Sequence, residues 1–385
     1  MGLSLKLQCD NDWGGTSFAA PRWAGYIALV NQQAVANGGS PVGFINPAIY
    51  TIGLGSSYGA NFHDIISGTN GSYSAETGYD LVTGWGSPNG TGLINSLCGT
   101  SMRYMLWAGP GGSASIWTLN SSNNYITSNV YGPYSGWTPV SYSYNPGGTS
   151  TLLWAGTGGY AGYADIWTLN GSNNLTTYNV YGPFSGWTPV NYSYNPADGT
   201  RTLLWAGTGG YASIWTLDSS NNLTTYNVYG PFSGWTPVYY SYNPLDATRT
   251  LLWTKTGGYA SLWTLDGSNN YTGCKPYGPF SGWTPVSYSY NPADGTATLL
   301  WAGTGGYASI WTLDSSNNYK GSQVYGPDSG WTPVSYSYNP TDGTRTLVWA
   351  GTGGYASVWT LDDSNNLTTY NIYGPFSGWT PVQYQ

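Results

Sequence analysis

The chain has 385 residues, enough for about two or three domains, and its 6% of charged residues and net charge of −7 exclude a basic nucleic-acid-binding surface. Aromatic residues make up 17%, which argues against disorder, and no run of about 18 apolar residues predicts a membrane span. Because His63 is the single histidine, any mechanism or metal site that needs two imidazoles from this chain is also excluded.

The N-terminal residues and the cysteines give limited information. MGLSLKLQC does not read as a signal peptide, since its apolar stretch is short and Lys6 interrupts it. A surface rich in Gly, Ser, Thr, Asn and Tyr is nevertheless typical of secreted proteins, so we expect an extracellular protein whose signal and pro-region precede Met1. Cys9, Cys98 and Cys274 are too few for a disulfide scaffold; a Cys9–Cys98 bond and reduced buried thiols are both compatible with the sequence.

The first predicted element is an apolar helix that follows a glycine turn. In WGGTSFAAPRWAGYIALVNQQAVANGG, Ser17 stands at the start of the helix, Pro21 in its first turn, and Asn37-Gly38-Gly39 at its end. A helix N-terminus offers unpaired N–H groups and a positive dipole end to an oxyanion. Ser17 is therefore a candidate nucleophile, with a structural N-cap as the alternative.

Three further motifs follow in order: NPAIY at 46–50, FHDII at 62–66 and TGYDLVTGWGSPNG at 77–90. Together with GGTSFAAP, they closely resemble the C-terminal part of the sedolisin (serine-carboxyl) endopeptidases, over about residues 9–98. The resemblance implies a subtilisin-like α/β fold and an acid-active, secreted peptidase that acts on protein or peptide substrates. It also implies that Ser17 is the acylated nucleophile.

The family's other catalytic groups are a base Glu, its Asp partner and an oxyanion Asp, all far upstream of the serine. This chain has sixteen residues before Ser17, and Asp10 and Asp12 are too near the serine to match any of the three. A serine without a base is a poor nucleophile, so we expect the chain alone to be inactive. A late-start gene model, a processed piece and a degenerate remnant remain open as explanations.

The same resemblance implies a calcium site. Oxygen ligands from a tight loop suit Ca²⁺, which takes about six to eight of them. Glu76 stands where the family has glycine, and its main-chain carbonyl is the ligand. Turn capping by the two aspartates is the alternative interpretation. The positions that match the family's ligands are Asp64, Ile65, Glu76, Gly78 and Asp80.

The resemblance also predicts how this segment is covered. In a subtilisin-like domain the Ser17 helix packs on a parallel sheet, most of which is encoded upstream. Trp23, Ile27, Leu29 and Val30 would then have too little to cover them, and exposed apolar patches favour association. We therefore expect residues 1–98 to be mobile alone, or docked on the rest of the chain or on another chain.

From residue 101 one motif of about 48 residues is repeated six times. Each copy contains three tryptophans at equivalent positions. The first series is Trp107, Trp154, Trp205, Trp253, Trp301 and Trp349. The second series is Trp117, Trp167, Trp215, Trp263, Trp311 and Trp359. The third series is Trp137, Trp187, Trp235, Trp283, Trp331 and Trp379.

Each repeat reads as four short strands, represented by TLLWAG, ASIWTLD, LTTYNVYG and WTPVSYSY, with turn-forming clusters between them. Four strands in a unit of this length are typical of a propeller blade, so six copies predict a six-bladed β-propeller over 101–385. Two fused β-trefoils are the weaker alternative. The terminal WTPVQYQ can close the ring beside residues 103–107.

The first two tryptophan series lie inside strand-like runs, and we expect them to fill the space between blades. For the third series, which follows the GPFSG turn, packing and ligand contact are equally open alternatives. Exposed rings beside Asn, Asp and Tyr suit sugars, and repeated sites provide avidity. The layout resembles the six-bladed fucose-binding lectins and tectonin-type propellers, although the repeats contain no Glu and an Arg recurs in only some copies, among them at Arg201, Arg249 and Arg345.

In sum, the sequence predicts a mainly β protein with a partial subtilisin-like α/β segment (1–98) and a six-bladed β-propeller of four-stranded blades (101–385). Two functional classes follow. One is a secreted serine-carboxyl endopeptidase whose propeller tethers it to a glycan, a cell surface or a protein substrate. The other is a non-enzymatic, carbohydrate-binding (lectin-like) or surface-assembly protein that keeps a peptidase remnant.

Overall fold

The structure is a computed structural model, and the chain divides into two compact units, Met1–Thr100 and Ser101–Gln385, each described here by itself. Cys9, Asp10, Asp12 and the predicted helix stop at 37–39 lie outside the described residues. The residues that the structure describes are 16–36, 42–55, 58–98, 102–145, 148–195, 198–292, 294–339 and 343–385.

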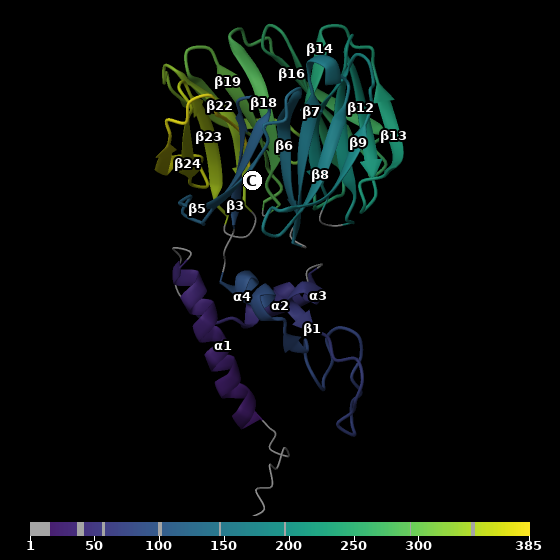
Figure 1. The fold of residues 1–385 in the computed structure, drawn as a ribbon, viewed down its shortest axis with the longest axis vertical. Helices are drawn as coiled ribbons and strands as arrows, with labels where there is room; N and C mark the ends of the chain where they lie inside the picture. Colours follow the sequence, from purple (N-terminus) through teal and green to yellow (C-terminus); the bar gives the residue numbers. More distant parts are fainter. Residues whose placement is uncertain are drawn as a thin grey trace, which may run out of the picture. The chain divides into compact units, whose positions relative to one another are not determined.

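The described part of the N-terminal unit is mainly helical (Figure 1). β1 and β2 are two-residue strands that pair antiparallel, with Phe62 opposite Pro88. The large parallel sheet of a subtilisin-like fold is not found among these described residues. The elements are α1 (Thr16–Ala36), α2 (Asn46–Leu54), α3 (Tyr58–Asn61), β1 (Phe62–His63), β2 (Ser87–Pro88) and α4 (Gly90–Leu97).

This unit has a small core of its own. Val30 on α1 is wholly buried and belongs to one apolar cluster with Phe62 of β1 and Leu93 of α4. Cys98 lies in the same cluster, and its thiol donates to the Asn95 carbonyl at 3.3 Å. Residues far apart in the sequence therefore bury one another without a central sheet.

The apolar residues of α1 are covered unequally. Val30 is completely buried, so the expectation that it lacks cover is wrong. Trp23 and Ile27 are half-buried against the core, whereas Leu29 is 50% exposed. The unit thus covers one face of α1, as an amphipathic helix requires, and leaves another face open.

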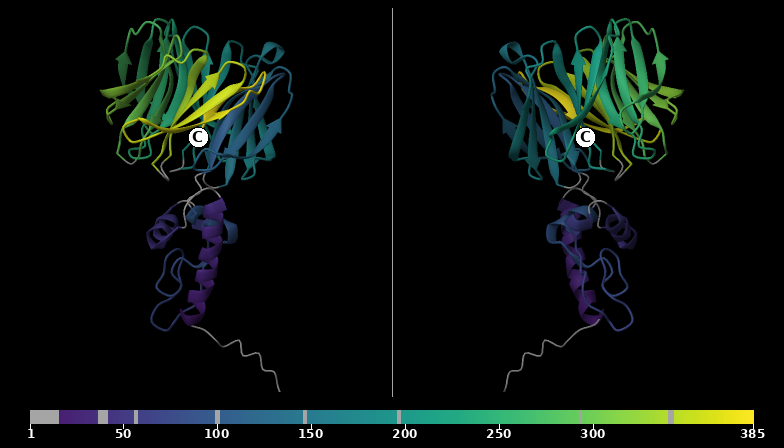
Figure 2. Two further views of the ribbon diagram at one scale, coloured as in Figure 1. Left: turned by 90° about the vertical axis from the view of Figure 1, so that its left-hand side faces the viewer. Right: turned by 90° about the vertical axis from the view of Figure 1, so that its right-hand side faces the viewer.

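The C-terminal unit is a six-bladed β-propeller, and each blade is a four-stranded antiparallel sheet (Figures 1 and 2). Five blades begin at a tryptophan of the third series and the sixth at Thr380, the residue after Trp379, a boundary that the repeat alone does not define. In five blades the strands are consecutive: β6–β9 (Trp137–Asn145, Thr149–Gly156, Ala164–Asn170, Leu175–Tyr181), β10–β13 (Trp187–Tyr194, Arg201–Gly207, Tyr211–Leu217, Leu223–Tyr229), β14–β17 (Trp235–Tyr242, Arg249–Lys255, Tyr259–Leu265, Tyr271–Tyr277), β18–β21 (Trp283–Tyr290, Ala297–Gly303, Tyr307–Leu313, Tyr319–Tyr325) and β22–β25 (Trp331–Tyr338, Arg345–Gly351, Tyr355–Leu361, Leu367–Tyr373).

The sixth blade closes the ring by joining the two ends of the unit. Its strands, in order, are β26 (Thr380–Tyr384), β3 (Arg103–Gly109), β4 (Ser113–Leu119) and β5 (Tyr125–Tyr131). β26 pairs with β3, and Tyr104 exchanges two backbone hydrogen bonds with Gln385, at 2.8 and 2.9 Å. The first strands of all six blades contact one another in a closed cycle. The predicted propeller and its closure are therefore confirmed, and the β-trefoil alternative is wrong.

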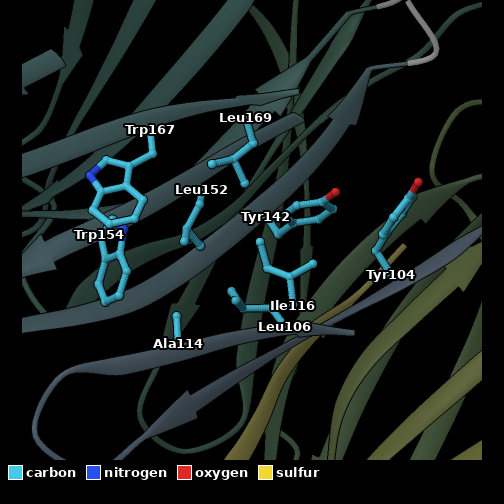
Figure 3. Packing of buried hydrophobic residues seen from close by; sticks show 9 residues of the cluster. All are labelled: Tyr104, Leu106, Ala114, Ile116, Tyr142, Leu152, Trp154, Trp167 and Leu169. Atoms are coloured by element: carbon cyan, nitrogen blue, oxygen red, sulfur yellow. The ribbon is translucent and has the colours of Figure 1, made fainter. Parts of the chain in front are cut away.

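The cores lie between neighbouring blades. In the cluster of Figure 3, Leu106 and Ile116 of one blade pack against Tyr142, Leu152 and Trp154 of the next. All six tryptophans of the first series are 1% exposed, as their expected packing role requires. Each blade therefore depends on its neighbours to bury its apolar face, which explains why the module is repeated around a closed ring.

The repeated SNN turn joins one blade to the next through its first asparagine. Asn173 has φ +57°, a left-handed conformation that asparagine tolerates better than most residues. Its side-chain Oδ1 accepts hydrogen bonds from Tyr142 at 2.8 Å and Ser150 at 2.9 Å. Its main-chain carbonyl accepts one from Tyr131 of the preceding blade. One buried residue thus satisfies three hydroxyl groups.

Candidate functional site

Ser17 lies near the beginning of α1, and it is exposed. Pro21 lies inside α1 rather than in its first turn, which corrects the expectation from the sequence. Because proline has no N–H, the Ser17 carbonyl cannot receive the usual hydrogen bond from the residue four positions later. Within the described part of the chain, no carboxylate or imidazole hydrogen bonds to the Ser17 hydroxyl.

The loop between β1 and β2 contains the expected calcium ligands. Asp80 is buried, and its Oδ1 accepts hydrogen bonds from the N–H groups of Val82 at 2.8 Å and Thr83 at 2.6 Å. Its Oδ2 accepts from the Thr83 hydroxyl at 2.9 Å and from the Glu76 N–H at 3.2 Å. These bonds, above all that from the Thr83 N–H, lower the pKa of Asp80, so it is ionised at neutral pH.

Asp64 faces the same loop. Its Oδ2 accepts from the Gly78 N–H at 2.8 Å, whereas its Oδ1 is buried without a hydrogen-bond partner. The pKa of Tyr58 rises to about 12, first because of burial and then because of Asp64 and the more distant charge of Asp80. Both carboxylates therefore act on one tyrosine, and the local electrostatic field is negative.

These residues fit a calcium ion in their chemistry. No group of three His, Cys, Asp or Glu side chains comes together among the described residues, so two carboxylates would have to be completed by main-chain oxygens. The buried, unpaired Oδ1 of Asp64 is an oxygen that a cation can satisfy. Glu76 is not among the residues with positive φ, so its side chain is tolerated where the family has glycine.

The third tryptophan series is half-buried rather than fully displayed. In four blades the indole lies on a glycine of the adjacent strand: a Cβ on Gly207 would lie 2.9 Å from Trp187, and one on Gly109 would lie 2.6 Å from Trp379. The missing side chain lets the ring lie so close, whereas the residue opposite Trp235 is Lys255. One part of each indole is thus packed, and the remainder borders the surface.

A cavity of about 350 Å³ lies in the blade formed by β10–β13. Trp187 of the third series lines it, together with Trp205, Trp215 and Phe184. Tyr226 lines it too and is 61% exposed. The cavity is therefore an aromatic pocket in the size range of about 300–1,000 Å³ that small ligands occupy.

Sequence reasoning identified the Trp187 position but not the other walls of this cavity. Trp205 and Trp215 belong to the first two series and were assigned to packing alone. Ser213, another lining residue, accepts the Trp215 indole N–H at 3.1 Å. The signals that could have revealed the pocket are the Phe184 and Tyr226 positions, where aromatic rings recur in several repeats.

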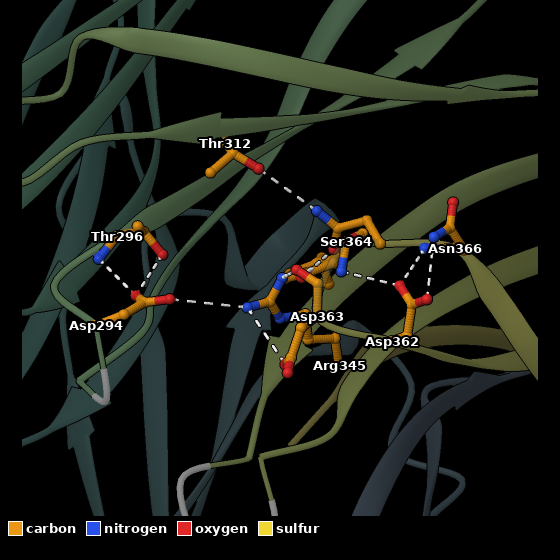
Figure 4. Close-up of polar contacts among 10 residues, drawn as sticks. Asp294, Thr296, Thr312, Arg345, Asp362, Asp363, Ser364 and Asn366 are labelled. Carbon is orange, nitrogen blue, oxygen red and sulfur yellow. Dashed lines mark hydrogen bonds and ion pairs between the residues drawn. The ribbon is translucent and has the colours of Figure 1, made fainter.

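The recurrent arginines are structural and do not line this cavity. Arg345 is 8% exposed, donates to the Asp363 carbonyl, and lies 3.9 Å from Asp294 and 3.7 Å from the Asp363 carboxylate (Figure 4). Arg249 is 5% exposed and donates to the Asp266 carbonyl at 3.2 Å. Buried guanidinium groups occupied in this way are not available to clamp a sugar.

No helix in the described ranges is both long and apolar enough to cross a membrane. No family model matches the sequence. Comparison with curated proteins and with solved structures nevertheless finds partial relatives for the chain.

Three peptidases are similar to about a fifth of the chain. Tripeptidyl-peptidase sed1 of Aspergillus fumigatus is 40% identical over 87 residues, which are 21% of this chain and 13% of that protein. Tripeptidyl-peptidase 1 of Rattus norvegicus is 33% identical over 93 residues, 22% of this chain and 16% of that protein. Kumamolisin of Bacillus sp. (strain MN-32) is 39% identical over 90 residues, which are 22% of this chain and 15% of that protein. The chain thus spans 13–16% of the length of these relatives.

Solved structures share the propeller fold at low sequence identity. A chain from a nidogen/laminin complex aligns with a TM-score of 0.52 and 11% identity, covering 73% of this chain and 97% of that chain. A protein from Lactobacillus plantarum aligns with a TM-score of 0.51 and 11% identity, covering 74% and 99%. These likenesses concern the fold alone. The chain therefore combines a short region homologous to part of the sedolisin-family peptidases with a six-bladed β-propeller.

Proposed function

We propose that the chain is the C-terminal part of a secreted sedolisin-type serine-carboxyl endopeptidase, and that Ser17 is its nucleophile. The observation that carries this proposal is the partial homology to three peptidases at 33–40% identity. The exposed position of Ser17 near the beginning of a helix supports it, since the N–H groups there favour a developing oxyanion.

On this proposal, Ser17 needs a carboxylate base, and no described residue hydrogen bonds to it as one. Positioned acid–base catalysis contributes about 10²- to 10⁴-fold to rate, so a serine without it hydrolyses peptides too slowly for an enzyme. The chain alone is then inactive. Its substrates, when the site is complete, are proteins or peptides.

The test is peptide hydrolysis at acid pH by a polypeptide that extends the chain upstream through a complete sedolisin catalytic region. We expect hydrolysis by this longer polypeptide, and its loss in Ser17→Ala. Ser67→Ala is the matched control, because Ser67 is an exposed serine of the same unit. Equal activity of Ser17→Ala and the parent would refute the assignment of Ser17.

A second proposal concerns the propeller, which we assign to carbohydrate binding outside the cell. The aromatic cavity beside Trp187 supports it, because the C–H faces of sugars stack on rings and their hydroxyl groups bond to polar neighbours. Related pockets around the ring would provide avidity for a repetitive glycan or cell-surface ligand. As a non-enzymatic function, this binding does not depend on whether the peptidase site is complete.

A glycan array with residues 101–385 and with the full chain tests this second proposal. We expect hits on both, and weaker binding by Tyr226→Ala, which removes an exposed ring from one pocket. Tyr73→Ala in the full chain is the control, since Tyr73 is an exposed tyrosine of the other unit. An array without a sugar hit would overturn carbohydrate binding.

We also propose that the loop from Asp64 to Asp80 binds calcium, with the two carboxylates and the main-chain oxygens of Ile65, Glu76 and Gly78 as ligands. Bound calcium would neutralise the two carboxylates and hold the loop closed. It would stabilise the N-terminal unit in proportion to its occupancy. Asp64→Asn removes the charge beside the unpaired oxygen and should abolish calcium-dependent stabilisation.

Thermal unfolding with calcium and with a chelator measures this effect. The parent chain should melt at a higher temperature with calcium, whereas Asp64→Asn should melt at the same temperature under both conditions. Asp198→Asn, in an exposed turn of the propeller, is the matched control and should keep the calcium response. A parent chain that does not respond to calcium would refute the site.

A further inference from the structure

In one blade a carboxylate replaces a serine that the other five blades share. The residue two positions before the second-series tryptophan is Asp165 in the blade formed by β6–β9. The same position holds a buried serine in the other blades: Ser115, Ser213, Ser261, Ser309 and Ser357. The corresponding Ser213 lines the cavity of the neighbouring blade, so the substitution places a carboxylate at the position of a cavity wall.

The same blade carries a second difference. Trp154 and Trp167 are 13 residues apart, whereas the equivalent tryptophans of the next blade, Trp205 and Trp215, are 10 apart. The extra residues form a 3₁₀ turn containing Tyr160, which is 49% exposed. Tyr160 stacks on Trp137 of the third series at 5.5 Å and 29°. The carboxylate of Asp165 and the added ring of Tyr160 therefore occur in the same repeat.

Asp165 lies within a group of aromatic rings. It is directly opposite Trp154 on β7, and its Oδ2 accepts the Trp167 indole N–H at 2.8 Å. Tyr134 lies edge-on to Trp154 at 5.6 Å and to Trp167 at 5.5 Å. Tyr178, opposite Trp167 on β9, is 61% exposed. The surroundings of the carboxylate are thus ring faces and edges.

The charge of Asp165 is not compensated within the described residues. Its Oδ1 is buried and has no hydrogen-bond partner, and no described lysine, arginine or histidine forms an ion pair with it. Burial raises the pKa of this carboxyl to about 6 despite the bond from Trp167. An unpaired carboxylate among rings is costly, and a cation is the partner that relieves this cost.

We propose that the Asp165 blade binds an ammonium group, and specifically the amine of a deacetylated amino sugar. Asp165 would pair with the ammonium through Oδ1, and the surrounding indole and phenol faces would add cation–π attraction. The sugar ring would stack on the exposed rings of this face, Tyr134 and Tyr178. The inference rests on the proposed carbohydrate function and adds that one blade selects a charged unit.

The choice of a sugar amine follows from the two kinds of group present. Ring faces alone would accept any sugar, as the serine-type blades do on the proposed function. A buried carboxylate disfavours neutral groups that donate no hydrogen bond to it. The free energy lost by leaving the buried charge unpaired is larger than the free energy gained from a weak contact. Asp165 therefore acts as a specificity-determining residue, and the serine blades serve as internal controls.

The test is calorimetric titration of the full chain at pH 7 with a glucosamine oligosaccharide and with its N-acetylated counterpart, which has lost the charge. We expect the amine form to bind about ten- to a hundredfold more tightly at one site per chain. Asp165→Ser introduces the residue of the other five blades and should abolish this preference. Asp165→Asn, which keeps the acceptor for Trp167 and removes the charge, should do the same.

Ser213→Asp provides the converse experiment, because it should create a second amine-selective site in the next blade. Unfolding curves establish that each variant is folded. Equal affinity for the two oligosaccharides, or an unchanged preference in Asp165→Asn, would overturn the inference while leaving neutral sugar binding intact. If neither oligosaccharide binds in the titration, the inference is overturned. If a full glycan array also gives no hit, the proposed carbohydrate function is overturned as well.

Discussion

The two units of this protein bury their apolar residues in different ways. In the N-terminal unit, α1, β1 and α4 share one small cluster around Val30, Phe62 and Leu93, while Phe44 and Leu54 are each 80% exposed. In the propeller, each of six clusters is formed by the same residue types from two adjacent blades. Repetition gives every blade a neighbour that buries its apolar face, whereas the N-terminal unit leaves large apolar side chains exposed.

The comparison also concerns carboxylates. Asp80 in the N-terminal unit receives four hydrogen bonds, and its pKa is lowered, above all by the bond from Thr83. Asp165 in the propeller receives one, and burial raises its pKa to about 6. The hydrogen bonds of its loop stabilise the anionic form of Asp80, whereas burial destabilises the anionic form of Asp165.

The largest expected effect tests the interlocked blades. Trp301→Ala should destabilise the propeller by about 3–5 kcal/mol, because a 1% exposed indole leaves a cavity between two blades. Denaturant unfolding followed by tryptophan fluorescence measures the change. A loss below about 1 kcal/mol would mean that the blades do not depend on these contacts.

The next effect concerns the SNN turn. Asn173→Ala should cost about 2–4 kcal/mol, since it strains a residue at φ +57° and leaves the Tyr142 and Ser150 hydroxyl groups without their acceptor. Asn173→Gly removes the same acceptor without the strain and should cost about 1 kcal/mol less. Equal losses for the two variants would show that the conformation contributes nothing.

An exposed asparagine of the other unit sharpens this result. Asn70 accepts from the N–H groups of Ser72 at 3.0 Å and Tyr73 at 2.9 Å, but water can replace it. Asn70→Ala should therefore cost about 1 kcal/mol or less. Equilibrium unfolding of both alanine variants under one condition compares the two turns directly.

A smaller effect comes from pH, and the two aspartates have opposite signs. The raised pKa of Asp165 means that the folded propeller binds its proton more tightly than the unfolded chain, whose aspartate has a pKa of about 3.9. This contribution is complete below about pH 4 and is lost as the pH rises through about 6; after discounting for partial exposure it is about 1–2 kcal/mol. The described titratable groups around Trp167, the hydrogen-bond partner of Asp165, are Tyr131, Tyr134 and Tyr178.

Unfolding of the parent and of Asp165→Ser between pH 7 and pH 4 measures this effect. The propeller of the parent should gain stability relative to the variant as the pH falls. The Asp80 contribution of the N-terminal unit has the opposite sign and stays constant over this range, because a lowered pKa contributes stability that is lost only below about pH 4. Parallel pH curves for the parent and Asp165→Ser would contradict the assignment of a strained carboxylate.

The smallest effect is expected on the open face of the N-terminal unit. Leu54→Ala should change the free energy of unfolding by less than about 0.5 kcal/mol, because the side chain is 80% exposed. Thermal or denaturant unfolding of the full chain checks this value. A loss comparable to that of Trp301→Ala would show that Leu54 is buried in solution, and that the two units are covered more equally than the comparison states.

Much of the propeller could be predicted from the sequence, because strand, turn and ring positions recur six times. An assignment that is ambiguous in one copy is therefore decided by the equivalent positions in the others. The position of Ser17 near the beginning of a helix could also be predicted, although the place of Pro21 in that helix was not. The aromatic pocket was missed, since tryptophans assigned to packing also form its walls. Asp165 was missed because a consensus of six repeats conceals the one copy that departs from it.

The repeat length, the four strands of each repeat and the motifs shared with the peptidases could all be read from the sequence, because local periodicity and turn chemistry are encoded in neighbouring residues. The boundary of each blade and the set of rings around Asp165 became visible in the tertiary structure alone. Those features depend on contacts between residues that can be more than 200 positions apart, such as Tyr104 and Gln385. Such contacts are selected by ring closure and shared burial, which no single repeat contains.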